Sequence, residues 1–243
     1  MAAAAVAAEL AGVEEGGDGK VRLWLAEGED AGELCRRLEP WRPVVERVED
    51  RNWNEPWQSE WKPVEIGQRF FLVPPDDPAP TPSGRIRLAM HPGTAFGNGD
   101  HPTTHLCLIA MERDLRGGDT FLDIGCGSGL LGEAARALGA GHTIGCDLDG
   151  AAVRRDAFVG SVSAVRSASC DFVAANIQLG VLIEIMPEVA RVMRPGGRGV
   201  LSGILAEQVE PLRRALMRHG LQPGLTAILD GWMSVGVTTA PAG

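Results

Sequence analysis

The sequence predicts an α/β protein whose main domain is a doubly wound parallel sheet that ends in an antiparallel hairpin. Three observations predict this fold. After residue 85, short apolar segments alternate with segments of helical periodicity. A glycine-rich turn follows the first of these apolar segments. Only Asp230-Gly231-Trp232 separates the last two, and Asp-Gly between strands is typical of a β-hairpin.

The predicted strands and helices follow one another without a long interruption. Residues 119–124 form an apolar strand that leads into the glycine-rich turn, and residues 129–140 form its following helix. A second strand, 142–149, ends on acidic residues. The remaining predicted elements are a strand at 170–177, a helix from 179 to 193, a strand within 194–205, a helix at 206–220, and strands at 225–229 and 233–239.

A proline-rich stretch separates this domain from the preceding residues. Five prolines within residues 72–84 break any helix and favour extended backbone. We therefore predict a small α+β module over residues 1–60, a Pro-rich linker over 61–84 and the main domain over 85–243. Within the module we predict an Ala-rich helix at the start, strands at 21–25 and 44–48, and a short helix at 31–38.

Three tryptophans, Trp53, Trp57 and Trp61, recur every four residues and would form a stripe on a helix. Such a stripe suits either a hydrophobic contact between domains or an aromatic wall for a substrate peptide.

The composition excludes several classes of protein. The 243 residues are 44% hydrophobic, which is enough to build a full core. The 32 acidic residues outnumber the 23 basic ones, the formal net charge is −9, and no basic block is present to bind nucleic-acid phosphates. The five cysteines are widely spaced without a CxxC pair, as is typical of reduced cytoplasmic proteins. We expect a cytoplasmic protein with neither a signal peptide nor a membrane span.

The glycine-rich turn favours one kind of ligand. Residues 127–132 match GxGxxG, and Asp147 follows about twenty residues later, which alone would predict a dinucleotide. Asp123 precedes Gly125 by two residues and would place a carboxylate beside the pyrophosphate, where like charges repel. S-adenosylmethionine (SAM) carries an ammonium and a sulfonium and has no phosphate. We therefore predict SAM, with Asp147 accepting hydrogen bonds from its ribose; the alternative role for Asp147 is a helix N-cap, which Asp149 suits better.

A loop at residues 91–105 contains three of the five histidines. His101 and His105 would share one face of a helix beginning near Pro102, but the third ligand and assisting Glu typical of a zinc site are missing, so we expect no metal. The glycines of this loop and the hydroxyls of Thr103 and Thr104 favour a lid over the cofactor instead.

Five segments together resemble the bacterial PrmA family, which methylates the large-subunit ribosomal protein L-eleven. The segments are PGTAFGNGDHPTTHLCL, FLDIGCGSGLL, GCDLDGAAV, VAANI and RPGGRGVLSGIL, and the likeness runs from about Trp53 to the C-terminus. It implies a class I, Rossmann-like methyltransferase sheet of seven strands over 85–243, with SAM as donor and an N-terminal substrate-recognition module. The predicted donor-binding residues are Thr104, Gly125, Gly127, Asp147 and Asn176, and no catalytic base is assigned.

The sequence departs from the family pattern at three places. Gly97-Asn98-Gly99 replaces the usual Gly-Thr-Gly, and the interval from Asp149 to Asn176 is short, so the helix after the second strand is cut back. Gly160-Ser161 occupies the position of a Gly-Asp pair that commonly contacts adenine.

The predicted activity is SAM-dependent methylation of amino groups, on lysine side chains or an N-terminal α-amine, of a ribosomal large-subunit protein. Asn176 is followed by Ile-Gln-Leu rather than by the Pro-Pro-aromatic run of enzymes that methylate planar nitrogens, which favours an aliphatic amine over DNA or glutamine. We expect no direct nucleic-acid specificity and no membrane partner. The alternatives are a methyltransferase for another protein or a small molecule, and a SAM-binding module without turnover.

Overall fold

The computed structural model describes residues 12–15, 21–24, 31–45, 62–90, 99–150, 153 and 156–241. The chain divides into two compact units, Met1–Asn52 and Trp53–Gly243. The domain boundaries expected near residues 60 and 84 stay a prediction.

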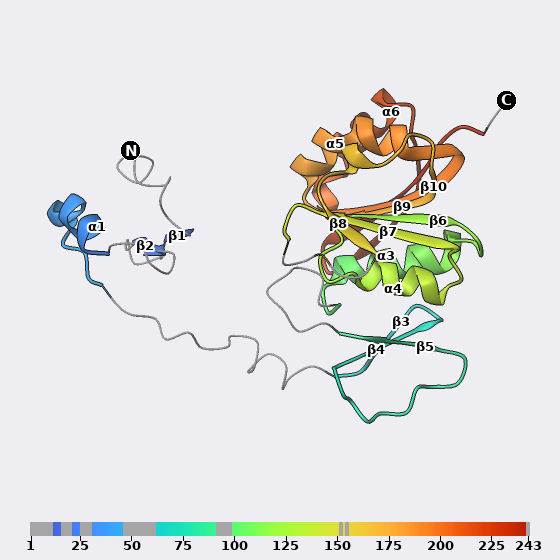
Figure 1. Ribbon diagram of the computed structural model, residues 1–243, viewed down its shortest axis with the longest axis horizontal. Coiled ribbons are helices and arrows are strands. Elements are labelled where there is room, and N and C mark those ends of the chain that lie inside the picture. Colours follow the sequence, from blue (N-terminus) through green and yellow to red (C-terminus); the bar gives the residue numbers. More distant parts are fainter. Residues whose placement is uncertain are drawn as a thin grey trace. The chain divides into compact units, whose positions relative to one another are not determined.

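The N-terminal unit contains a strand pair and a short helix (Figure 1). Strands β1 (Gly12–Glu15) and β2 (Val21–Trp24) pair antiparallel, and α1 (Ala31–Arg37) agrees with the predicted short helix. Val44 and Val45, predicted to begin a strand, have irregular exposed backbone because no neighbouring strand pairs with them in the described part of this unit. Residues 46–48 of that predicted strand, the predicted Ala-rich helix and the three tryptophans lie outside the described residues.

The larger unit is built on a seven-stranded sheet with the order β11-β12-β10-β9-β6-β7-β8. Neighbouring strands from β10 to β8 run parallel, whereas β12 runs antiparallel to both β10 and β11. The predicted doubly wound, seven-stranded sheet with a C-terminal antiparallel hairpin is thereby confirmed. Its strands are β6 (Thr120–Ile124), β7 (His142–Asp147), β8 (Ala157–Val159), β9 (Cys170–Asn176), β10 (Met193–Leu205), β11 (Gln222–Leu229) and β12 (Trp232–Thr238).

Helices cover both faces of this sheet (Figure 1). Helices α3 (Pro102–Asp114) and α4 (Leu130–Ala137) lie on one face, and α5 (Leu179–Val192) and α6 (Val209–Arg218) lie on the other. Side chains alternate across the sheet, so Phe121 packs into the core under α3 and α4 while Leu122 packs into the core under α5 and α6. Phe121 stacks on Phe172 of the adjacent strand β9, with ring centroids 6.0 Å apart.

A second, three-stranded sheet packs beneath α3 and α4 (Figure 1). It consists of β3 (Val64–Ile66), β4 (Phe70–Val73) and β5 (Ile86–Ala89) in the order β3-β4-β5. All four residues of β4 are buried, and Phe70 and Leu72 share a core with Leu108 and Met111 of α3. Within the stretch predicted as a linker, residues 64–66 and 70–73 form β3 and β4, and the five prolines lie in the connection between β4 and β5.

The connection from β7 to β8 is short. Only residues 148–156 separate the two strands, and the described residues of this interval contain no helix, in agreement with the expected shortening. Strand β8 pairs parallel with β7 through three residues, from Gly145 opposite Ala157 to Asp147 opposite Val159. Across the described ranges of the chain, we find no helix with the length and apolar character that crossing a membrane requires.

Candidate functional site

The candidate site lies where the winding of the sheet reverses direction. Strand β6 pairs with β7 on one side and with β9 on the other, so the chain leaves the carboxyl ends of β6 and β9 toward opposite faces. Ligands of open α/β sheets bind at such a switch point. Three of the predicted donor-binding residues meet there, because Gly125 follows β6, Asp147 ends β7 and Asn176 ends β9.

The glycine-rich turn after β6 has a left-handed backbone conformation that residues other than glycine rarely adopt. Gly125, Gly127 and Gly129 have φ values of 69°, 49° and 81°. A Cβ atom on Gly125 would lie 2.5 Å from Cγ2 of Ile177, so no larger residue fits there. A Cβ on Gly129 would meet nothing within 4 Å, which leaves the turn open on that side. The turn therefore brings backbone close to the switch point without filling it.

Asp147 joins the turn to the end of β7. One carboxylate oxygen accepts a hydrogen bond from the backbone N–H of Gly127 at 2.9 Å, and the other accepts one from the N–H of Asp149 at 3.0 Å. These bonds fix the carboxylate at the edge of the sheet. Each oxygen keeps a second lone pair that a ribose hydroxyl could use.

Thr104 and Asn176 meet on the other side of β6. The Asn176 Nδ2 group donates to Oγ1 of Thr104, which is buried in the first turn of α3, at 3.4 Å. Helix α3 begins at Pro102, as predicted, but His101 is its N-cap, with Nδ1 accepting from the N–H of Thr103 at 3.3 Å. The structure thus brings Thr104, Gly125, Gly127, Asp147 and Asn176 to one edge of the sheet, while residues 91–98 of the expected lid lie outside the described part of the chain.

Asp123 is the most unusual ionisable group at this edge. Its side chain is 2% exposed, and neither carboxylate oxygen has a hydrogen-bond partner within bonding geometry among the described residues. Burial, with a smaller contribution from the charge of Asp147, raises the pKa of Asp123 to about 7, although the nearby N–H of Gly132 acts in the opposite direction. A buried carboxyl without a partner is costly unless a cation pairs with it. The ammonium of SAM is such a cation, so the residues present fit this donor.

Comparison with known proteins identifies the family. A model described as ribosomal protein L11 methyltransferase (PrmA) matches residues 29–239. The chain belongs to the PrmA family. It is thus a class I, SAM-dependent protein methyltransferase, as the sequence resemblance implied.

Individual relatives agree with this assignment. The ribosomal protein L11 methyltransferase of Azotobacter vinelandii is 39% identical over 205 residues, which cover 79% of this chain and 69% of that protein. The protein of the same name from Chromohalobacter salexigens is 36% identical over 225 residues, covering 87% and 73%. The crystal structure of ribosomal protein L11 methylase from Lactobacillus delbrueckii subsp. bulgaricus has the same fold, with a TM-score of 0.67, 24% identity and coverage of 74% of this chain and 99% of that one.

The structure describes two of the histidines near α3 in this PrmA member, His101 and His105. The His101 ring packs edge-on against Trp232, with centroids 4.8 Å apart. Nε2 of His105 is buried without a hydrogen-bond partner, and burial lowers the pKa of this side chain. Within the ranges that the structure describes, no three His, Cys, Asp or Glu side chains gather as a metal site would require, and the expected absence of a metal stays a prediction.

Sequence reasoning missed two residues that shape this edge. Ile177 lies against Gly125, and its backbone N–H donates to the carbonyl of Ser202 in β10 at 3.2 Å. Trp232 begins β12 and reaches His101 from far along the chain. No local pattern marks either contact, because each joins segments that are far apart in the sequence and meet only in the folded unit.

Proposed function

We propose that this chain transfers methyl groups from SAM to amino groups of ribosomal protein L11, on lysine side chains or an N-terminal α-amine. The single observation that carries the donor assignment is the buried, unpartnered carboxyl of Asp123 beside the glycine-rich turn. Family membership supports the acceptor, since the relatives named above are called ribosomal protein L11 methyltransferases.

The chain's own residues would hold the donor by charge and hydrogen bonding. Asp123 would pair with the ammonium of the amino acid tail, and Asp147 would accept from the ribose hydroxyls. Gly125 and Gly127 would allow the backbone to approach the tail closely. When bound, SAM supplies a methyl group that its sulfonium already activates toward attack by an amine.

Asn176, which the family resemblance makes a donor contact, would also position the acceptor, and Thr104, the other predicted donor contact, would hold the Asn176 amide. The Asn176 Nδ2 group donates to Thr104, so the amide carbonyl oxygen is the group that would accept an N–H from the incoming amine. A lysine amine has an ordinary pKa of roughly 10.4 and must lose a proton before it attacks. Burial at this edge and a neighbouring cation both lower that pKa, so the proton can leave to solvent without a dedicated base.

The acceptor's chemistry follows from the residues after β9. Ile177 and Gln178 follow Asn176 where enzymes that methylate planar nitrogens carry a Pro-Pro-aromatic run. We infer an aliphatic amine on a basic protein, which the net charge of −9 would attract at long range. We also propose that the N-terminal residues 1–60 recognise this protein, that nucleic acid is not read directly, and that the enzyme acts in the cytoplasm, where ribosomal proteins are made.

The test is methyl transfer from isotope-labelled SAM. The full chain is incubated with L11 purified without its methyl groups, and the label is located by amino acid analysis. We expect methylated amines on L11, and we expect an Asn176→Ala variant to transfer far less label. Label found only on another protein or a small molecule would replace the proposed acceptor, and donor binding without transfer would indicate a binding module.

A further inference from the structure

The order of the strand ends indicates where each part of the donor would lie. Asn176, Asp123, Asp147 and Gly160 follow one another across the carboxyl ends of β9, β6, β7 and β8. Neighbouring strands are about 4.8 Å apart. With the tail at Asp123 and the ribose at Asp147, the adenine attached to the ribose continues in the same direction, toward the end of β8.

The segment that follows β8, residues 160–169, would then flank the adenine. It begins beside the ribose acid, since the N–H of Gly160 donates to the backbone carbonyl of Asp147 at 2.8 Å. Its one element of secondary structure is a single 3₁₀ turn, Val162–Ala164, in which Ser161 Oγ accepts from the N–H of Ser163 at 3.3 Å. Its internal backbone hydrogen bonds, from Ala164 to Ser161 and from Val165 to Val162, lie within that turn, so the rest of the segment needs outside contacts to hold one conformation.

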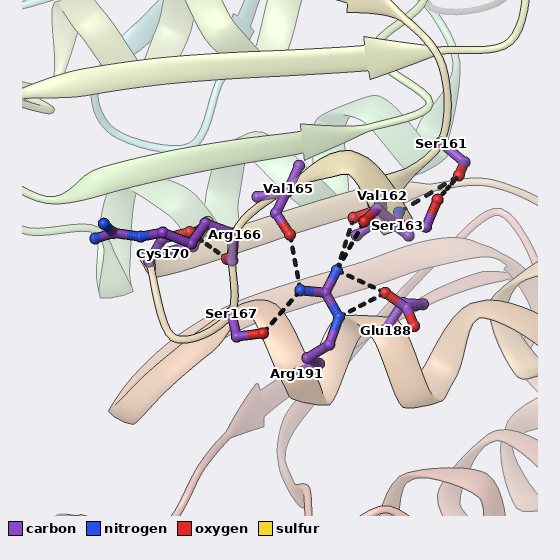
Figure 2. Close-up of polar contacts among 10 residues, drawn as sticks. Ser161, Val162, Ser163, Val165, Arg166, Ser167, Cys170, Glu188 and Arg191 are labelled. Carbon is purple, nitrogen blue, oxygen red and sulfur yellow. Dashed lines mark hydrogen bonds and ion pairs between the residues drawn. The ribbon is translucent and has the colours of Figure 1, made fainter.

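One side chain supplies most of those contacts (Figure 2). Arg191, in the last turn of α5, donates to the carbonyl oxygens of Val165 at 2.7 Å, Val162 at 3.2 Å and Ser163 at 3.3 Å. It also donates to Oγ of Ser167 at 3.0 Å. These bonds reach the 3₁₀ turn and the residues after it, so one guanidinium ties both halves of the segment to α5.

Other contacts fix Arg191 itself and the far end of the segment. Nε of Arg191 donates to a carboxylate oxygen of Glu188, one turn earlier in α5, at 2.7 Å. The backbone carbonyl of Arg191 accepts from the N–H of Ala168 at 2.8 Å. Val162 and Val165 are buried in the core that α5 shares with the sheet. The planar guanidinium, with its five N–H donors, suits this arrangement, whereas a lysine ammonium could satisfy fewer of the carbonyls.

We propose that Arg191 is a positioning residue for the adenine end of the donor site: it holds residues 160–169 in the conformation that receives the base. This inference rests on the proposed donor. Arg191 acts through the segment and contacts no reacting atom, so its loss weakens donor binding and leaves the transfer step intact. If the segment keeps the binding conformation only about one tenth of the time without Arg191, the apparent Kd for the nucleoside rises about tenfold.

The experiment compares Arg191→Met and Arg191→Lys with wild type in the full chain, using S-adenosylhomocysteine (SAH) and adenosine as ligands. We expect Arg191→Met to raise the Kd of both ligands about tenfold. The KM for SAM should rise by the same factor, while kcat at saturating SAM and the KM for L11 stay within about twofold. Arg191→Lys should recover part of the affinity.

Two control variants separate this role from others. Arg194→Met removes a nearby arginine that pairs with Asp171 in β9 and makes no contact with residues 160–169 among those that the structure gives, so its nucleoside affinity should match wild type. Asp123→Asn should weaken SAH and spare adenosine, which has no ammonium tail.

Several results would overturn the proposal. They are adenosine affinity within twofold of wild type in folded Arg191→Met, equal losses in the Arg194→Met control, or a kcat that falls as far as the affinity. A different result would show that the proposed function is wrong: wild-type protein that binds SAH but does not methylate L11. A wild type that binds neither ligand would overturn both.

Discussion

The substitution Asp123→Asn tests whether the buried carboxyl of Asp123 makes the stability of the protein depend on pH. Burial raises the pKa of Asp123 from its ordinary value of 3.8 to about 7. Between these two pH values the folded protein keeps a proton that the unfolded chain has released, so the stability of the wild type falls as the pH rises through this window. Since one pKa unit corresponds to about 1.36 kcal/mol, the loss reaches about 4 kcal/mol at pH 8.

The asparagine variant has no proton to lose at this position and keeps a similar side-chain volume. All other titrating groups are shared with the wild type, so they largely cancel in the difference. The free energy of unfolding of Asp123→Asn should therefore match the wild type near pH 4 and exceed it by up to about 4 kcal/mol at pH 8 in the absence of donor.

The assay is urea denaturation followed by circular dichroism at several pH values, with and without SAH. SAH should stabilise the wild type at pH 8, because its ammonium pairs with the ionised carboxyl, and should stabilise the variant much less. A stability difference that is the same at pH 5 and pH 8 would refute the buried-carboxyl reasoning, and so would equal stabilisation of both proteins by SAH.

Three further substitutions test the rest of the site. Asp147→Ala should raise the Kd for SAH about 100-fold, because hydrogen bonds from two ribose hydroxyls to a charged group are lost. Calorimetry that finds unchanged affinity would contradict the assignment of Asp147 to the ribose. Gly125→Ala should lower the free energy of unfolding by about 2 kcal/mol or more, because its φ of 69° is strained and its new Cβ would meet Ile177; a denaturation curve like that of the wild type would contradict this. Asn176→Ala should reduce kcat for methyl transfer by about 100-fold and change SAH affinity much less, whereas a full loss of SAH binding with normal kcat at saturation would assign it to the donor alone.

The parts of the fold with strong local signals were predictable from the sequence. Strand β6, its glycine turn and α4 follow from an apolar run, three glycines at fixed spacing and helical periodicity. The final hairpin follows from Asp230-Gly231, whose φ values of 49° and 78° are the left-handed pair that a tight hairpin turn requires. These features depend on neighbouring residues alone.

The strands that were missed have no such signal. Strand β8 has three residues, which is too short for any periodicity to register, and it exists because β7 offers a free edge. Strand β4 is buried on both faces, so its residues do not alternate, and the prolines that follow it dominate the local pattern. Pairing with the edge of β7 decided the first strand, and tertiary burial decided the second.

The candidate site likewise has residues whose positions the sequence predicts and contacts that it does not. Gly125, Asp147 and Asn176 lie at or just after the carboxyl ends of predicted strands, so their meeting at one edge follows from parallel pairing. The contacts of Arg191 with residues 162–167 depend on how α5 lies against the segment after β8. Nothing in the sequence near Arg191 indicates those partners, because backbone carbonyls carry no sequence signature.

Calorimetry of SAH binding at pH 6 in buffers of different ionisation enthalpy tests the donor assignment most directly. With the pKa of Asp123 at about 7, the carboxyl is mostly protonated at this pH and must ionise to pair with the ammonium. We predict one SAH per chain with release of close to one proton, and no heat with NADH. Binding of NADH, or SAH binding without proton release, would contradict the assignment.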